Sequence, residues 1–313
     1  MSAAGPLLAR RVRRPVRLLA ELAAHEPRTT EMLGELRAFG RGVTGLAPWR
    51  ARLWEVRVDG RLLGALLLGR KAFDQWHGTV FLADAAAAAP LAAALDGGPA
   101  RSVSGAERDV APLRPLVPRA VGMTVLPWIV LEPPIAVAPD PDGTARLATP
   151  ADLDALTDLY HGYELWGLTN AWQVRQALRQ ALRHGTVLVA ERDGLLAGAA
   201  MFTARTDRYL VLDGLTVPPE HRRSGVAWSV AAQAQAFANQ HGLGATLALA
   251  ATNPMPLAPL AGPERWGGMW MVPRHRFPGQ GRLRSLYLGL HPRQGRAPVL
   301  VRDPTDPSRP PVF

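Results

Sequence analysis

Two arginines and a glycine lie where a predicted strand is followed by a predicted helix, a position that favours the binding of a phosphate group. The run 215–230, LTVPPEHRRSGVAWSV, begins at the end of a β-prone segment, passes two prolines and enters a long helical pattern. The first turn of a helix has unpaired N–H groups and a partial positive charge, which together hold phosphate oxygens. Arg222 and Arg223 add charge-assisted hydrogen bonds there, and Gly225 lets the backbone approach a ligand closely. The alternative is that both arginines face water at an ordinary helix start.

The elements on either side of this joint follow from hydrophobic spacing. Residues 209–217 have the composition of a strand, and residues 225–241 carry an apolar stripe at helical spacing. Gly242 ends this helix, and residues 244–250 are predicted as the next strand. The predicted order of the second half is therefore β-α-α-β-β-β-α-β, then an irregular stretch and two further strands. The remaining predicted elements of this half are strands at 145–149, 186–191, 195–203, 269–272 and 283–290, a helix that starts at Thr149-Pro150-Ala151-Asp152, and a helix at 171–184. Asp193-Gly194 is predicted as a tight hairpin turn between the strands 186–191 and 195–203. Thr149 is predicted at the N-cap position, with Asp152 three residues later in the first turn.

The pattern Arg222-x-x-Gly225-x-Ala227 resembles the acyl-CoA signature of the GNAT superfamily of N-acetyltransferases. The strand order of the second half is similar to that family's order as well, and the resemblance covers residues 145–291. A second match to the pattern occurs at residues 37–42. It ends a predicted helix and no strand leads into it, so its context does not fit a phosphate loop. Arg222 lies between a strand and a long helix, so its match is the one that fits the acyl-CoA signature.

The resemblance implies that acetyl-CoA is the acyl-donor substrate and that it lies between the strand ending at Val217 and the strand 244–250. The diphosphate of the donor would contact the first turn of the helix, and the pantetheine arm would pair with the backbone of the preceding strand. The family's mode of binding implies these cofactor-binding residues: Leu215, Val217, Arg222, Arg223, Ser224, Gly225, Val226, Ala227 and Asn253.

Asp213 is the candidate catalytic base. Family members often have a carboxylate at this point of the strand, where it takes the proton of the acceptor amine directly or through water. A backbone N–H near Leu215 and Val217 is then the implied donor to the developing oxyanion. Aspartate is disfavoured inside strands, so its presence in YLVLDGLTV needs a reason. The alternative reason is an aspartate that stabilises a bulge beside Gly214 through a hydrogen bond.

The segment after the strand 244–250 departs from the family's pattern. Asn253 matches an asparagine that commonly supports the cofactor or the substrate, or it caps the next helix with Pro254 at the first helical position. The family usually places a tyrosine about seven residues later as the general acid for the leaving thiolate, and this chain has Leu260 there. Either another group or water protonates the thiolate, or the enzyme is slow or inactive.

The acceptor is expected to contact the segment 161–172, HGYELWGLTNAW, because family members build the substrate wall between the first two helices of the domain. Tyr163, Glu164 and Trp166 offer aromatic faces and one carboxylate, which suit a cationic or hydrophobic amine. The alternative is that the aromatic residues belong to the core and that Glu164 is solvated.

The chain is predicted to have an α/β fold with a mixed sheet, in two GNAT-like domains. Each domain would consist of a central, mostly antiparallel, twisted sheet flanked by helices. The first half shows a weaker version of the element order of the second, and it includes a predicted helix at 106–116. It has no phosphate loop at the equivalent joint, residues 84–87, so its expected role is structural. The predicted boundaries are a degenerate domain at 1–136, a linker at 137–144, the acetyltransferase domain at 145–292 and a Pro/Arg-rich tail at 293–313.

Composition narrows the chemistry. The 313 residues include no cysteine, which excludes disulfides, thiol nucleophiles and cysteine-ligated metals. The 8 histidines show no metal-ligand spacing, so no metal site is expected. Neither a Walker loop nor a dinucleotide fingerprint occurs. The formal net charge of +10, with Lys71 as the single lysine, indicates either an anionic partner or biased codon usage. No signal-type apolar segment follows the arginines near the start, so we expect a cytoplasmic protein.

The leading hypothesis is an acetyl-CoA-dependent N-acyltransferase that moves an acetyl group to the amine of a small molecule or a peptide N-terminus. The second hypothesis, a catalytically lapsed acyl-CoA-binding sensor or scaffold, follows from Leu260 and the proline-rich segment around it. A third, nucleic-acid binding through the arginine-rich start, has no recognition motif to support it. We therefore expect a small-molecule amine as the partner, and neither a nucleic acid nor a membrane. The acceptor, the acyl chain length and the choice between a monomer and a homodimer stay open.

Overall fold

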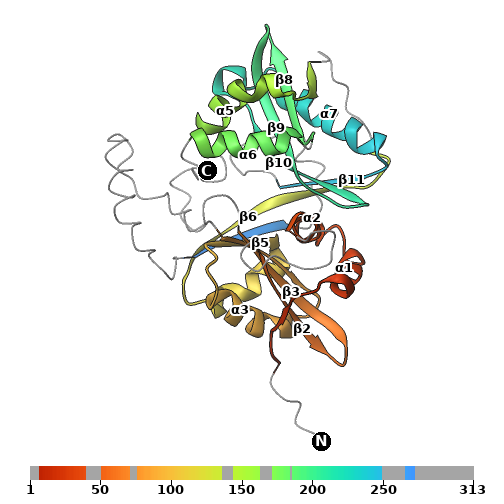
Figure 1. Ribbon diagram of the computed structural model, residues 1–313, viewed down its shortest axis with the longest axis vertical. Helices are drawn as coiled ribbons and strands as arrows, with labels where there is room; N and C mark the ends of the chain where they lie inside the picture. The colour runs from red at the N-terminus through yellow and green to blue at the C-terminus, as the bar shows by residue number, and fades with distance from the viewer. Residues whose placement is uncertain are drawn as a thin grey trace, which may run out of the picture. The chain divides into compact units, whose positions relative to one another are not determined.

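The chain forms two compact units, and each unit is made of segments that are not continuous in sequence. Unit 1 comprises Met1–Arg14, Gly45–Val125 and Trp266–Phe313, and unit 2 comprises Pro15–Thr44 and Leu126–Arg265. The computed structural model (Figure 1) describes residues 7–39, 51–70, 76–135, 144–162, 171–183, 185–248 and 265–271.

These units differ from the predicted boundaries, which are continuous in sequence. Residues 15–39 group with the second half of the chain, and residues 266–271 group with the first. Hydrophobic spacing identifies an element and its buried face, but it does not say which other element covers that face. A sequence-based boundary therefore assigns each element to its neighbours along the chain.

The sheet of unit 2 contains one parallel pair among otherwise antiparallel strands. Its order is β6-β11-β10-β9-β8-β7, and β10 and β11 are the parallel pair. Their pairing runs from Tyr209 opposite Gly244 to Leu212 opposite Leu247. The strands are β6 (Ala120–Leu131, of which the last residues belong to unit 2), β7 (Ala145–Leu147), β8 (Val187–Arg192), β9 (Leu195–Arg205), β10 (Tyr209–Thr216) and β11 (Gly244–Ala248).

Helices cover both faces of this sheet, as Figure 1 shows. They are α5 (Leu153–Gly162), α6 (Ala171–Arg183) and α7 (Val226–Gln240). Leu188 and Ala190 of β8 pack in one core with α7, whereas Val187 and Val189 pack in another core with α5 and α6. Alternate residues of β8 thus point to opposite faces, as the two-residue repeat of a strand requires. The sheet therefore holds α7 on one face and α5 with α6 on the other.

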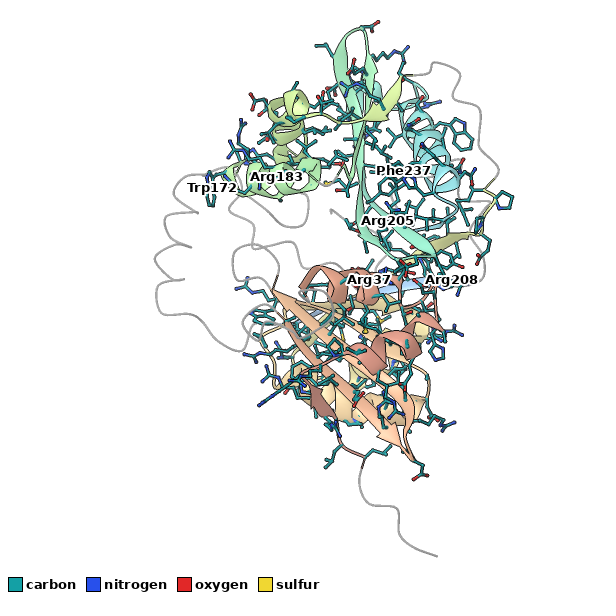
Figure 2. All side chains as sticks on the ribbon, turned by 45° about the vertical axis from the view of Figure 1, so that its right-hand side comes forward. Arg37, Trp172, Arg183, Arg205, Arg208 and Phe237 are labelled. Carbon is teal, nitrogen blue, oxygen red and sulfur yellow. The ribbon has the colours of Figure 1, made fainter. Side chains whose placement is uncertain are left out.

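The first two helices of the chain also belong to unit 2. They are α1 (Val16–Ala23) and α2 (Thr30–Phe39). α2 lies so close to β9 that a Cβ added to Gly34 would be 2.5 Å from the Cβ of Ala204. One turn further on, Arg37 Nη2 lies 2.6 Å from Asp207 Oδ2 and Arg37 Nη1 lies 3.2 Å from Asp207 Oδ1. Figure 2 shows Arg37 beside Arg205, at the turn where β9 ends.

The turn and capping residues predicted from the sequence have the expected conformations. Asp193 and Gly194 have φ values of +53° and +75°, the positive pair that a two-residue hairpin turn needs. Thr149 N–H donates to Asp152 Oδ2 at 2.6 Å, and the two residues form a reciprocal capping box ahead of α5. Both predictions are confirmed.

The sheet of unit 1 is built in the same way. Its order is β1-β2-β3-β4-β5-β12-β6, with β4 and β5 as a parallel pair. α3 connects these two strands, just as α7 connects β10 and β11. The predicted α/β fold, with a mostly antiparallel mixed sheet and flanking helices in each half, is confirmed. The elements of unit 1 not yet given are β1 (Arg10–Val12), β2 (Ala51–Val58), β3 (Arg61–Arg70), β4 (Trp76–Leu82), η2 (Ala85–Ala87), α3 (Ala88–Asp96), β5 (Ser102–Ala106), α4 (Glu107–Val110), η3 (Ala111–Leu116) and β12 (Arg265–Met271), where η2 and η3 are 3₁₀ helices.

Some predicted elements differ from the structure or lie outside it. The helix predicted from residue 106 to 116 divides into α4 and the 3₁₀ helix η3, because Pro112 and Pro115 lack the N–H groups that an α-helix would use. The strand predicted at 283–290 lies outside the described residues, as does the linker 137–144 apart from Thr144. Among the helices that the structure describes, none is long and apolar enough to cross a membrane.

The close approach of α2 to β9 predicts an unusual response to a small substitution. Gly34→Ala in a helix interior would ordinarily stabilise the protein by about 0.8–1 kcal/mol. We expect a loss of about 1–3 kcal/mol instead, because the new methyl group overlaps Ala204. Urea denaturation measures the change. Gly268→Ala is the control, since its Cβ would meet no atom within 4 Å; a Gly34→Ala protein as stable as this control would contradict the packing of α2.

Candidate functional site

The first turn of α7 is open to a ligand. Gly225 is the N-cap residue, with a φ of +88°, and it has no side chain to accept a hydrogen bond from the N–H groups that follow. Within the described residues, the backbone N–H groups of 223–227 have no acceptor. The hydroxyl of Ser224, which is the nearest side-chain oxygen in sequence, donates to the carbonyl of His221 at 2.5 Å instead. Five consecutive backbone donors therefore remain for an anion.

The backbone of this loop is strained at Arg223. Its φ is +63° and that of Gly225 is +88°, whereas Ser224 between them has a negative φ. A left-handed conformation costs a residue other than glycine about 1–2 kcal/mol. The other described non-glycine residues with positive φ, Asp59 and Asp193, both precede a glycine in a two-residue hairpin turn. Alternation of the sign of φ gathers successive N–H groups into an anion-binding concavity, which gives the strain at Arg223 a function.

Three arginines surround this loop. Arg222 Nε donates to the carbonyl oxygen of Val217 at 3.3 Å, and Arg223 is exposed with no side-chain partner among the described residues. Arg192, at the end of β8, donates from Nη1 to the carbonyl oxygen of Ser224 at 3.2 Å. The sequence did not predict Arg192, because 32 residues separate it from Ser224. Only the folding of the β8–β9 hairpin brings its side chain to the loop.

Gly198 of β9 sets how closely the start of α7 approaches the sheet. A Cβ at this position would be 2.6 Å from Val226 Cγ1. The side chain of Val226 is buried in the core, with 4% of its surface exposed. Of this predicted cofactor-binding residue, only the backbone N–H is therefore available to a ligand. Ala227 is half-buried, and its small side chain leaves room beside the helix.

A cavity of about 570 Å³ opens beside the start of α7. Ser224, Val226 and Ser229 form its wall on the side of the helix, and residues 144–146 and 191–194 form the opposite wall. The cavity lies on the side of the β8–β9 hairpin. On the side of β11, residues 249–264 lie outside the described part of the chain.

An ion-pair network holds one wall of this cavity. Arg146 donates to both carboxylate oxygens of Asp152, at 2.8 and 2.9 Å, and also pairs with Glu191. The hydrogen bond from Arg146 is the main cause that lowers the pKa of Asp152 to about 2, and it raises the pKa of Arg146 in turn. Asp152 is therefore charged throughout the physiological pH range. It caps the start of α5, and through Arg146 it is linked to β7 and to Glu191 of β8.

In unit 1 the equivalent connection, from β4 to α3, has a carboxylate that caps the helix start. Asp84 is the N-cap residue of the 3₁₀ helix that precedes α3, and its side chain accepts a hydrogen bond from Ala86 N–H at 2.9 Å. A negative charge at this position would repel a phosphate. The contrast with Gly225 supports the prediction that the phosphate loop is at the start of α7.

In the second match to the sequence pattern, residues 37–42, the arginine makes a different contact. Its arginine, Arg37, forms the bidentate ion pair with Asp207. The two glycines of that match, Gly40 and Gly42, lie outside the described residues. In the described ranges, no group of three histidine, aspartate or glutamate side chains is arranged to hold a metal ion.

β10 contains a bulge after Asp213. Among the described residues its pairing with β11 extends to Leu212, and its pairing with β9 extends to Thr216. The register with β9 shifts between Asp213 and Thr216, and Gly214 has a φ of +64°, so a β-bulge occupies this segment. Leu215, a predicted cofactor-binding residue, is half-buried and lies within the bulge.

Asp213 stabilises this bulge, as one of the two sequence-based interpretations expected. Its Oδ1 accepts a hydrogen bond from the N–H of Gly214 at 2.6 Å. The side chain is exposed, and its second oxygen has no partner among the described residues. The observed contact does not occupy the whole carboxylate, so a role as a base is compatible with it.

Tyr160 of α5 lies beneath the bulge and was not predicted as a site residue. Its side chain is fully buried, and its hydroxyl donates to the carbonyl oxygen of Gly214 at 3.1 Å. Burial, reinforced by the nearby carboxylate of Asp213, raises the pKa of this phenol well above its ordinary value. The phenol therefore stays protonated and remains a hydrogen-bond donor. The hydrophobic spacing of the helix indicates only that Tyr160 is buried, since its partner is 54 residues away.

Several predicted site residues lie outside the described part of the chain. These are Asn253 after β11, and Tyr163, Glu164 and Trp166 between α5 and α6; Leu260, which stands where the family usually has a tyrosine, lies outside it as well. Their assignment to the acyl donor and to the acceptor stays a prediction.

Comparison with protein families places this site in a known context. Residues 153–255 match the model described as the Acetyltransferase (GNAT) family. The match begins with α5 and extends beyond β11, so it includes the bulge and the open start of α7. No curated protein matches the chain by sequence.

Solved structures resemble the chain over nearly its whole length. A Drosophila protein has a TM-score of 0.58 at 14% identity, over 86% of this chain and 100% of its own. A GCN5-related N-acetyltransferase from Sphaerobacter thermophilus has a TM-score of 0.54 at 12% identity, over 88% and 98%. A tandem GNAT protein from the clavulanic acid biosynthesis pathway has a TM-score of 0.51 at 18% identity, over 83% and 97%. At these identities the likeness concerns the fold, and it agrees with a tandem arrangement of two GNAT-like units.

The pairing of Asp152 with Arg146 predicts how acid affects stability. The pKa of Asp152 is about 2 in the folded protein, below its ordinary value of 3.8. The stabilisation is therefore present above about pH 4 and is lost as the pH falls towards 2. Because Arg146 is 41% exposed, solvent screening reduces the expected loss in Asp152→Asn to about 1 kcal/mol at neutral pH.

Urea denaturation at a series of pH values measures this dependence. The stability difference between wild type and Asp152→Asn should shrink as the pH falls from 4 towards 2. Asp158→Asn, a change at an exposed carboxylate of α5, is the control and should show no such difference. A difference that persists at the lowest pH would contradict the assignment.

Proposed function

We propose that this chain, whose residues 153–255 match the model of the GNAT family of acetyltransferases, transfers an acetyl group from acetyl-CoA to the amine of a small molecule or a peptide N-terminus. Family and fold support acyl transfer. The observation that carries the proposal further is the open start of α7, where five backbone N–H groups lie beside three arginines and have no acceptor among the described residues. A diphosphate has the charge and the oxygen atoms that such a loop binds, and coenzyme A carries one.

The donor would enter with its diphosphate on residues 223–227. Arg223 is exposed and would pair with a phosphate oxygen. Arg222 donates in this structure to the carbonyl of Val217, near the end of β10. If Arg222 turns to the diphosphate, that carbonyl becomes available to an amide of the pantetheine arm. Diphosphate binding and pantetheine binding would thus be linked through one side chain.

The reaction proceeds by direct attack of the acceptor. The amine nitrogen forms a bond with the thioester carbon, the carbon–sulfur bond breaks, and coenzyme A leaves as a thiolate that takes a proton from water. Asp213 would take the proton of the amine with the carboxylate oxygen that does not contact Gly214. The N–H of Leu215 would stabilise the oxyanion that forms on the carbonyl oxygen.

A catalytically lapsed acyl-CoA sensor is the second candidate. Leu260 in place of the family's tyrosine favours it, because no general acid for the thiolate is then evident. The two candidates share the binding of the donor and differ in turnover. Release of free thiol from acetyl-CoA, measured with a panel of small amines and peptide N-termini, separates them.

Binding of acetyl-CoA depends on the conformation of Gly225. Gly225→Ala should weaken binding by about 5- to 30-fold, because a left-handed alanine costs about 1–2 kcal/mol and the loop can relieve this strain only by leaving the concave shape. Isothermal titration calorimetry measures the dissociation constant. Absence of binding to the wild type at millimolar acetyl-CoA would end the proposal.

Gly242→Ala is the matched control for this substitution. Gly242 follows the C-terminal end of the same helix, has a φ of +64°, and its added Cβ would meet no atom within 4 Å. Both variants should lose similar thermal stability, and only Gly225→Ala should lose affinity for acetyl-CoA. Equal loss of affinity in both would mean that general destabilisation, and not the loop, explains the effect.

Turnover should depend on the charge of Asp213. Asp213→Asn keeps an oxygen that accepts from Gly214 N–H, so the bulge is retained, but it removes the base. The expected result is a kcat lower by about 10²- to 10⁴-fold with an unchanged dissociation constant for acetyl-CoA. Thiol release gives kcat and calorimetry gives the dissociation constant, with Asp158→Asn as the control. An unchanged kcat would leave Asp213 with only its contact to the bulge.

A further inference from the structure

Side chains, and not the strand ladder alone, hold the bulge of β10. The N–H of Gly214 donates to Asp213 Oδ1 at 2.6 Å, and its carbonyl oxygen accepts from Tyr160 Oη at 3.1 Å and from Thr216 Oγ1 at 3.2 Å. Neither Gly214 nor Leu215 has a Cα partner on β9 in the register. Both peptide units of Gly214 are therefore fixed by hydrogen bonds to side chains.

The hydroxyl of Tyr160 is the part of this arrangement that packing does not explain. The ring is fully buried in the core of α5 and α6, with Val174, Leu178 and Met201 in the same cluster. A phenylalanine would fill this space without bringing a polar atom into it. A buried hydroxyl is unfavourable unless it forms a hydrogen bond. The carbonyl of Gly214 accepts that hydrogen bond.

The direction of this carbonyl determines the direction of the next N–H. The peptide bond between Gly214 and Leu215 is planar, and in the trans form its C=O and N–H point in opposite directions. Two donors hold the oxygen of Gly214, one from α5 and one from the strand itself. The N–H of Leu215 must therefore point away from Tyr160. A glycine with a φ of +64° would otherwise let this peptide rotate.

We propose that Tyr160 is a positioning residue for acyl transfer: its hydroxyl fixes the Gly214–Leu215 peptide so that the N–H of Leu215 is directed at the oxyanion. Thr216 is the second donor in the same role. This inference rests on the proposed function for its chemistry. Its structural part, that Tyr160 sets the orientation of the Leu215 N–H, holds for the protein without substrate as well.

Such a fixed donor matters because stabilisation of an oxyanion requires a donor that is in place before the charge develops. A donor that must first rotate loses much of its effect. Misplacement of a group by about 1 Å costs on the order of 10²-fold in rate. Binding of the donor substrate depends on other contacts, chiefly the loop 223–227, so it should respond much less.

Tyr160→Phe tests the proposal in the full-length protein, with Tyr209→Phe as the matched control. Tyr209 lies at the start of the same strand, is equally buried, and loses a hydroxyl contact to Glu132 Oε1 of 2.5 Å. The expected result for Tyr160→Phe is a kcat lower by about 10- to 10²-fold with an unchanged dissociation constant for acetyl-CoA. Tyr209→Phe should leave kcat unchanged although its thermal stability falls. An unchanged kcat in Tyr160→Phe, or an equal fall in Tyr209→Phe, would overturn the proposal.

Thr216→Val provides a second variant that removes a hydroxyl with little change in shape. It should lower kcat in the same direction as Tyr160→Phe, since both hydroxyls donate to one oxygen. The double variant should lose no more than the product of the two single effects. A Thr216→Val protein in which kcat rises would contradict the shared role.

The N–H of Leu215 can also be observed without turnover. In protein labelled with ¹⁵N-leucine, with the resonance assigned through Leu215→Ile, Tyr160→Phe should shift the Leu215 amide signal and speed its hydrogen exchange. Tyr209→Phe should do neither. If the wild type binds no acetyl-CoA, the proposed function fails while this test still stands. An unaltered Leu215 amide in Tyr160→Phe would overturn the positioning role itself.

Discussion

Unpaired N–H groups at the start of α7 are the constraint around which the candidate site is built. Any helix begins with such groups, and most helices satisfy them with a capping side chain. Here the capping position is a glycine, and the nearby serine hydroxyl donates to His221 instead of accepting. Gly198 brings the first turn close to the sheet, and Arg192 holds the loop from the β8–β9 hairpin. The donors are thus kept in one orientation and left for a ligand.

The two units show that the same topology does not by itself make a binding site. Each unit has one parallel pair of strands connected by a helix that starts beside the sheet. In unit 1 the carboxylate of Asp84 accepts a hydrogen bond from the N–H of Ala86, and in the described part of unit 2 no side chain caps α7 in this way. The two helix starts therefore differ by a carboxylate in place of a glycine.

The chemistry proposed for unit 2 depends on one strand and the loop that follows it. The bulge at Gly214 and the loop 223–227 are parts of a single connection from β10 to α7. Asp213 illustrates why its two sequence-based interpretations were not exclusive: one oxygen stabilises the bulge and the other has no described partner. A carboxylate that shapes the backbone is also placed beside the donor that the same backbone presents. The structural role of Asp213 and its proposed chemical role therefore belong to one bulge.

Local patterns predicted much of this molecule. Alternation and helical spacing identified β8, β9, β10 and α7, and the Asp-Gly pair and the Thr149 capping box adopt the predicted conformations. The open loop around Gly225 was predicted as well, because strand, glycine and helix are neighbours along the chain. These features are determined by residues within a few positions of each other, so the sequence alone specifies them.

Tertiary structure alone decided the contacts between distant segments. Arg192 reaches Ser224 across 32 residues, Tyr160 reaches Gly214 across 54, and Arg37 reaches Asp207 across 170. It also decided that α1 and α2 belong to unit 2 and that β12 belongs, from Trp266 on, to unit 1. An apolar face or a charged side chain in the sequence indicates that the residue needs a partner. Which partner it meets depends on the packing of the whole unit, because many faces and charges of the same kind compete for it.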